Sequence, residues 1–168
     1  TISNFKMVCD NATPNRAWGL FGALGSGAVV ENLVFDASCS LEVKASKATD
    51  CGMLAGLVYD ATVRNVTNNA PMSFDGSAGN VRMTMGMIGL AFANEGVVID
   101  RLTNEADLTG EGGNNTTNGA TGVQIGGICG FSTNHASSAN AVAFTGCVNR
   151  GNLSTKAARA SGIVAAAN

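Results

Sequence analysis

The sequence predicts an all-β fold, a β-solenoid of about four to five coils of 33–41 residues with three short strands each. Three observations predict this fold: a glycine motif that recurs along the 168 residues, two apolar signals that follow it in register, and polar turns between them. The motif copies start 33, 34, 41 and 35 residues apart, at Gly19, Gly52, Gly86, Gly127 and Gly162. A period of this length is typical of stacked repeats.

The glycine motif defines the first strand of each coil and reads GLFG, GMLAG, GMIG, GICG and GIVA in successive copies. Glycine weakens a strand interior unless the backbone needs a special torsion or approaches a neighbour closely. The motif therefore predicts a turn or a close backbone contact at Gly19 and its equivalents. The alternative is a helix over residues 85–99, and the density of glycine there disfavours it.

Two further signals follow each glycine motif and predict the second and third strands of the coil. The second signal begins at Val30, Val63, Ile99 and Phe144, and the third at Asp36, Asn69, Glu105 and Arg150. Both are short and rich in apolar residues, which is typical of strands, whereas stretches such as SKATD and DGSAGN indicate turns. Parallel strands stack about 4.8 Å apart, so equivalent residues of successive coils should form columns.

The alignment predicts which columns face the core. Two inward columns come from the second strand, namely Val30, Val63, Ile99, Phe144 and Leu33, Val66, Leu102, Cys147. A third column consists of Cys39, Met72, Leu108 and Leu153. The glycine strand has two adjacent apolar columns: Leu20, Met53, Met87, Ile128, Ile163 and Phe21, Leu54, Ile88, Cys129, Val164. Adjacent strand residues face opposite sides, so one of these two columns is expected outside, where a partner would cover it.

Two polar columns are also expected. Glu31, Arg64, Asp100 and Thr145 should face outward with charges of alternating sign. The other column, Phe35, Asn68, Asn104 and Asn149, ends the second strand. Asparagine tolerates left-handed turn torsions and its stacked amides form hydrogen-bonded ladders, so this column is interpreted as a structural turn ladder.

Composition restricts the class of protein. Charged residues make up 13% of the chain and the formal net charge is −2, which gives no electrostatic basis for nucleic-acid binding. No apolar run reaches the roughly 20 residues of a membrane span. The five cysteines are irregularly spaced and match no disulfide or zinc framework. We expect one solenoid domain over 1–168, part of a longer protein, with a partial coil 1–17, coils 18–50, 51–84, 85–124 and 125–160, and a partial coil 161–168.

The repeats resemble the GLUG-type repeats of bacterial cell-surface and secreted proteins, which are named for a Gly-Leu-any-Gly motif. That motif stands in this sequence as Gly19-Leu20-Phe21-Gly22, and the following VVENLVFD is similar to the family's second strand. The resemblance covers nearly the whole chain and implies a right-handed parallel β-helix at a bacterial surface or outside the cell. It implies little about activity, because a fold does not fix a function.

Candidate chemistry is sparse. Polysaccharide-degrading β-helices need clustered carboxylates with a basic residue, and the nearest such set is Asp36, Glu105 and Arg150 in one column. These three are the candidate ligand-binding residues, for a cation or a sugar acid. The single histidine, His135, is expected in a surface loop. Cysteines in core columns are expected to act as small buried hydrophobes, so no catalytic residue, metal site or cofactor is predicted.

The leading hypothesis is a non-enzymatic surface or secreted module that acts as an adhesion or structural stalk segment. A carbohydrate-binding or polysaccharide-degrading β-helix is the first alternative. The second is a filament subunit that assembles through open solenoid ends, since unpaired strand edges invite pairing. The expected partners are another protein domain or a copy of this chain, on the apolar outer face or the open ends, or a glycan; nucleic acid and a membrane span are not expected.

Overall fold

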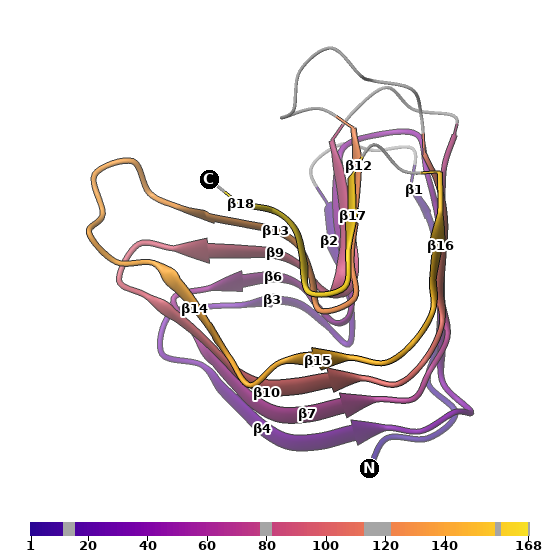
Figure 1. Cartoon of the computed structure of the whole chain (residues 1–168), viewed down its shortest axis with the longest axis horizontal. Helices are drawn as coiled ribbons and strands as arrows, with labels where there is room; N and C mark the ends of the chain where they lie inside the picture. Colours follow the sequence, from indigo (N-terminus) through magenta and orange to yellow (C-terminus); the bar gives the residue numbers. More distant parts are fainter. Residues whose placement is uncertain (12–15, 78–81, 113–121, 157–158, 168) are drawn as a thin grey trace.

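The structure is a computed structural model and describes residues 1–11, 16–77, 82–112, 122–156 and 159–167. The described residues contain no helix, and their strands stack in parallel as a β-solenoid of about four turns. The coils wind in a right-handed sense, with three sheets around the axis (Figure 1). The predicted all-β solenoid and the handedness that the GLUG resemblance implied are confirmed.

Sheet A contains the second strand of each coil and sheet B the third. Sheet A consists of β4 (Val29–Phe35), β7 (Thr62–Asn68), β10 (Val97–Asn104), β14 (Val142–Thr145) and β15 (Val148–Asn149). Sheet B consists of β1 (Lys6–Asn11), β5 (Ser40–Ala45), β8 (Met72–Gly76), β11 (Leu108–Gly112) and β16 (Leu153–Thr155). The two sheets meet at a corner, so each coil turns sharply between them (Figure 1).

Sheet C contains the glycine motif and bends in the middle, which divides it into two arms (Figure 1). The upright arm, opposite sheet B, has β2 (Arg16–Trp18), β12 (Val123–Gly126), β17 (Arg159–Ser161) and the first halves of β6 (Thr49–Tyr59) and β9 (Met83–Ala93). The transverse arm, opposite sheet A, has β3 (Phe21–Leu24), β13 (Cys129–Asn134), β18 (Val164–Ala167) and the second halves of β6 and β9. The coil is therefore L-shaped in cross-section.

The core columns largely follow the predicted alignment. Val30, Val63, Ile99 and Phe144 pair in register, as do Leu33, Val66 and Leu102. The placement of Cys39 in the third column is wrong, because Leu41 is the residue that pairs with Met72. The first coil has two more residues than the second between sheets A and B, and Cys39 is buried in that longer turn.

The bend in sheet C explains the glycines. A Cβ on Gly19 would lie 2.6 Å from the carbonyl oxygen of Gly52, and one on Gly89 would lie 2.5 Å from the backbone nitrogen of Cys51. A side chain at either position would thus collide with backbone, which cannot swing away. The predicted close approach is confirmed at Gly19, Gly52, Gly86 and Gly127, whereas a Cβ on Gly162, in the last copy, would meet nothing within 4 Å.

The expectation of an apolar outer column at the motif is wrong. Met53 and Leu54 are both fully buried, and so are Met87 and Ile88. The strand changes direction at the motif, so the alternation of inward and outward side chains is interrupted there. A register shift follows Gly52 in β6.

That register shift also corrects the alignment of the motif copies. Ala55, rather than Leu54, pairs with Phe21 and with Ile88. Gly126, rather than Gly127, follows directly on the pairing of Ile125 with Met85. Copies of the motif thus differ by one residue in the length of the bend.

The asparagine ladder is confirmed. Asn68 donates from Nδ2 to Oδ1 of Asn104 at 2.8 Å, and Asn104 donates to Oδ1 of Asn149 at 2.8 Å. Each amide also donates to a carbonyl two residues on, and Asn68 and Asn104 are fully buried. Phe35 occupies the ladder position in the first coil. The left-handed torsions lie instead at the sheet A bend, at Asn32 (φ 58°), Asn65 (φ 52°), Arg101 (φ 53°) and Gly146 (φ 61°).

Candidate functional site

The predicted edge residues lie in one column, as the alignment placed them, but they do not converge. Asp36 accepts hydrogen bonds from the hydroxyls of Ser3 and Ser38 and from the Ser38 backbone N–H at 2.8 Å. The Ser3 and Ser38 hydroxyls, with the Ser38 N–H, hold the pKa of Asp36 below its usual value. Asp36 therefore stabilises the turn in which it lies, because its carboxylate accepts hydrogen bonds from Ser3 and Ser38.

Glu105 and Arg150 form a separate pair on the same column. Arg150 Nη1 donates to Glu105 Oε1 at 2.5 Å, and both side chains are substantially exposed. Asn69 lies between Asp36 and Glu105 and donates to the carbonyl oxygen of Phe35 at 3.0 Å. The two carboxylates are thus two coils apart. Asp36 is hydrogen-bonded to serines and Glu105 is ion-paired with Arg150, so they do not form one shared binding site.

The remaining predicted features have ordinary environments. His135 is exposed in the loop after β13 and pairs through Nδ1 with the Ser137 hydroxyl at 2.8 Å. Burial raises the pKa of the Cys129 thiol to about 12, so it stays protonated and unreactive. Within the described parts of the chain, no group of three His, Cys, Asp or Glu side chains is placed to hold a metal ion, and no helix could cross a membrane.

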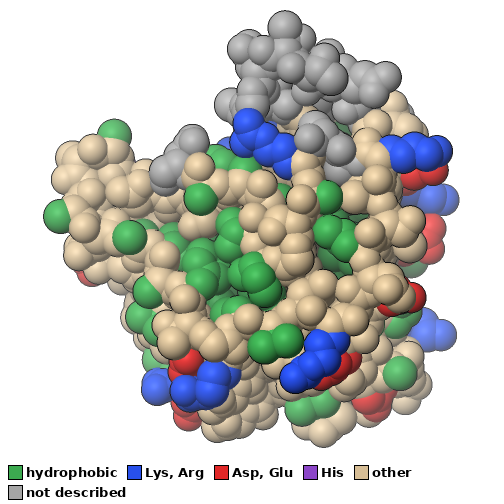
Figure 2. Space-filling model, viewed as in Figure 1, with side chains coloured by type: hydrophobic (Ala, Val, Ile, Leu, Met, Phe, Trp, Pro, Cys, Tyr) green, Lys and Arg blue, Asp and Glu red, His purple; other side chains and the backbone are tan. Residues whose placement is uncertain are grey.

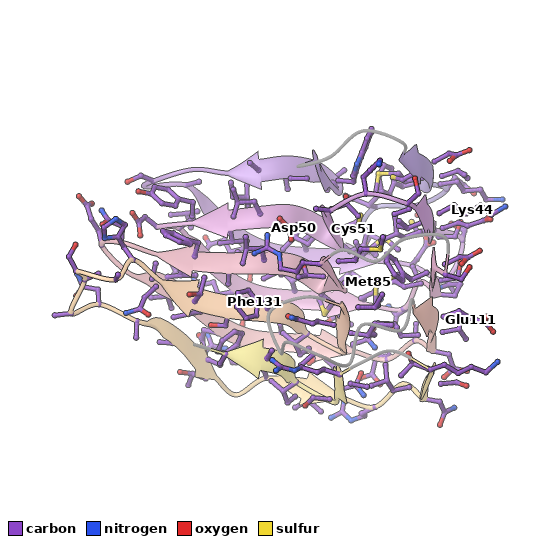
Figure 3. The ribbon with its side chains drawn as sticks, turned by 90° about the horizontal axis from the view of Figure 1, so that it is seen from above. Lys44, Asp50, Cys51, Met85, Glu111 and Phe131 are labelled. Atoms are coloured by element: carbon purple, nitrogen blue, oxygen red, sulfur yellow. The ribbon has the colours of Figure 1, made fainter. Side chains whose placement is uncertain are left out.

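The most unusual chemistry lies on the outer side of sheet C, in the angle between its two arms, here called the notch. Its upright wall is a polar column of Asp50, Thr84 and Gln124, which pair in register. Val123 and Ile125 belong to the core, so Gln124 between them faces the opposite side, into the notch. Figure 3 shows Asp50 reaching from the upright arm over the transverse arm, on the side where Phe131 lies.

The polar wall is linked by a chain of contacts. Thr84 donates to Asp50 Oδ1 at 2.7 Å, and Arg82 Nη2 lies 3.5 Å from both carboxylate oxygens. The side chain of Asp50 is only 16% exposed. Burial raises the pKa of Asp50, and the Arg82 charge and the Thr84 hydroxyl offset this only in part.

Gln124 is the exception in this wall. It is 1% exposed, and its Oε1 atom has no hydrogen-bond partner. A buried acceptor without a donor costs free energy, and most buried polar atoms in proteins are paired. The Cα partner of Gln124 in the next coil is Arg159, which makes no ion pair within the described parts of the chain.

The other wall of the notch is an apolar floor on the outer face of the transverse arm. Leu57, Leu90, Phe131 and Ala166 pair in register and form a small cluster separate from the main core. The Arg82 guanidinium lies over the Phe131 ring, 5.7 Å from its centroid. Two residues further along the strands, Tyr59 and Phe92 stack with centroids 5.7 Å apart at an interplanar angle of 19°. Both of these rings are half-buried.

Sequence reasoning missed the notch, although a signal was present. Asp50, Thr84 and Gln124 each interrupt an apolar strand at equivalent positions, next to Cys51, Met85 and Ile125. Aligning the strands before the glycine motif would have shown a polar column. That the column is buried against the transverse arm rather than facing open solvent depends on the bend, which alternation alone does not predict.

A scan against protein-family models gave no match, and neither did searches of curated proteins and of solved structures. The GLUG-type resemblance accordingly rests on the motif residues themselves.

Proposed function

We propose that the chain is a non-enzymatic repeat module of a bacterial surface or secreted protein, where it acts as an adhesion or structural stalk segment. The observation that carries the proposal concerns the charged groups: among the described residues, four of the six ion pairs join neighbouring coils along the solenoid axis. Examples are Arg64 with Glu31 at 2.8 Å and Arg150 with Glu105 at 2.5 Å. Charged side chains that pair between coils strengthen the contact between those coils. They do not converge on one point, as catalytic groups must.

The repeat itself supports the same role. Each coil contacts only its neighbours, so the fold extends by adding coils and suits a spacer that holds other parts away from a surface. The GLUG-like motif at Gly19–Gly22 points to the same setting, because that family belongs to bacterial surface and secreted proteins.

The location is tested by labelling intact cells of the source organism with an antibody raised against this chain. We expect labelling without lysis, and loss of the signal after external protease treatment, with a cytoplasmic protein as the negative control. Signal only after lysis would contradict the proposal. Incubation with acidic polysaccharides should yield no new reducing ends or unsaturated products; turnover would contradict the non-enzymatic part.

End-to-end association is a second candidate, favoured by the burial of the end coils. Val30 and Leu33 in β4 and Phe144 in β14 are half-buried, whereas their partners Val63 and Val66 are fully buried. The outer faces of these coils carry apolar surface that a further coil, from the same chain or from a second copy, would cover. Light scattering over a hundredfold range of concentration tests it: we expect the mass to rise with concentration, and a constant monomer mass argues against it.

A further inference from the structure

We propose that the outer face of sheet B binds a basic, extended peptide segment of a partner protein, whose lysine or arginine side chains meet the carboxylates of that face. The inference names a partner class for the adhesion role proposed above and rests on that role. Its test is a binding measurement on the purified chain, so its failure would leave the result of the cell-surface labelling unaffected.

The first step is the shape of this face, which is hollowed along a continuous path across β5, β8, β11 and β16. The largest hollow, of about 240 Å³, lies over Ser73 and Thr109, and a second hollow of about 180 Å³ shares both residues. Longer side chains, among them Lys44 and Glu111, stand in the next outward column and project from the sheet (Figure 3). The face is therefore a shallow groove along the solenoid axis, open to solvent.

The second step is the charge of this groove. Five of the twelve acidic side chains of the chain line its hollows, against two of the ten basic ones, which leaves seven acidic and eight basic residues elsewhere. Figure 2 shows acidic and basic side chains along the right-hand margin, where sheet B lies. An excess of carboxylates attracts a cationic partner and disfavours acidic polysaccharides and nucleic acid. The charged side chains of the groove are Asp10, Glu42, Asp75, Asp107 and Glu111, with Lys44 and Lys156.

The third step is that the two lysines of the groove hold its carboxylates only weakly. Lys44 Nζ lies 3.6 Å from Glu42 Oε1, and Lys156 Nζ lies 3.5 Å from Glu111 Oε1. All four side chains are exposed to solvent, and exposed ion pairs of this kind contribute little free energy. A basic side chain of a partner can therefore take the place of either lysine.

The centre of the groove offers further groups for a ligand. Asp75 makes no ion pair with another described residue, and the hydroxyl and the backbone N–H of Ser77 hold its pKa below the usual value. It is therefore ionised at neutral pH. The hydroxyls of Ser73 and Thr109 make no hydrogen bond within the described parts of the chain, so both can pair with the backbone of a bound peptide.

The residues of the groove favour a peptide over a sugar or a metal ion. Among the described residues that line the hollows, Phe74 is the one aromatic residue, and it is only 3% exposed. The groove thus offers no ring on which the C–H face of a sugar could rest. No group of three His, Cys, Asp or Glu side chains in the described ranges is placed to hold a metal ion. An extended peptide brings cationic groups for the carboxylates and backbone groups for the hydroxyls.

The test is fluorescence anisotropy of a labelled peptide with lysine at every second position, titrated with the whole chain at low and at raised salt. We expect saturable binding of this peptide and none of matched peptides in which serine or glutamate replaces each lysine. The affinity should fall as salt is raised, because exposed charges are screened. Asp75→Asn combined with Glu111→Gln should weaken the affinity by about tenfold, while thermal unfolding stays cooperative.

Matched variants distinguish a site on sheet B from a general attraction by net charge. Glu31→Gln combined with Glu105→Gln removes two carboxylates outside sheet B and should bind as the wild type does. Thr109→Lys adds a long basic side chain to the groove from an exposed position and should abolish binding, so it serves if the first double variant does not fold.

The proposal is overturned if the lysine peptide binds no better than the serine peptide, or if both double variants lose affinity equally. Normal binding by Thr109→Lys would also overturn it. Retention of a cationic amino-sugar oligomer in place of the lysine peptide would overturn the assignment to a peptide.

Discussion

Two buried columns of polar side chains run along this solenoid, the asparagine ladder beside sheet A and the Asp50–Thr84–Gln124 column of the notch. The ladder satisfies itself: Asn104 accepts from Asn68 and donates to Asn149 and to the carbonyl of Ala106. The notch column leaves Gln124 Oε1 without a donor. The ladder therefore contributes hydrogen bonds to stability, whereas the notch column carries the cost of an unpaired buried acceptor.

The largest effect should come from removing the bend on which the notch depends. In Gly52→Ala the new Cβ would collide with the carbonyl oxygen of Ala55 and lie 2.5 Å from that of Met87. Because both obstacles are backbone, we expect a loss of about 4 kcal/mol in the free energy of unfolding, measured by urea denaturation. Gly162→Ala is the matched control, since its Cβ would meet nothing within 4 Å. Equal losses in both variants would mean that contact with neighbouring backbone is not what requires glycine at position 52.

The second prediction tests the self-satisfied column. Asn104→Ala removes three side-chain hydrogen bonds and leaves the amide of Asn68 and the carbonyl of Ala106 short of partners in a buried place. At about 1 kcal/mol for each bond, the free energy of unfolding should fall by about 3 kcal/mol. Asn149→Ala, at the end of the ladder, should cost about half as much. If Asn104→Ala left the free energy of unfolding unchanged, the ladder would not be more stabilising than the notch column.

The sequence predicted the ladder and the coil more completely than the notch, for a physical reason. A regular repeat fixes which residues stack, so the partners of Asn68 and Val63 follow from alignment alone. Insertions inside turns and bends leave no periodic signal. For that reason Cys39 was aligned two residues before Leu41, the true partner of Met72, and Leu54 one residue before Ala55, the true partner of Ile88. The edge residues Asp36 and Glu105 were placed in the correct column. Their hydrogen bonds to Ser3 and Arg150 could not be predicted, because they depend on side-chain geometry.

The third prediction has the opposite sign to the second. In Gln124→Leu an apolar group of similar size replaces a buried amide whose Oε1 has no donor. Removing that cost should raise the free energy of unfolding by about 1 kcal/mol. A loss comparable to that of Asn104→Ala would make Gln124 structural.

The smallest effect concerns Asp50 and depends on pH. Burial raises the pKa of Asp50 in the folded protein, so the folded state holds its proton to higher pH than the unfolded chain does. Its contribution to stability therefore declines as pH rises from the ordinary carboxyl range through the folded-state pKa. Asp50→Asn has no such charge and keeps an oxygen for the Thr84 hydroxyl. The variant should be slightly more stable than the wild type at neutral pH, by less than Gln124→Leu, and the difference should vanish below about pH 4. Thermal unfolding of both proteins from pH 3 to pH 8 measures this directly. A variant that is less stable at neutral pH, with the deficit closing in acid, would show that the ion pair with Arg82 outweighs burial, and that the notch wall is held together by charge.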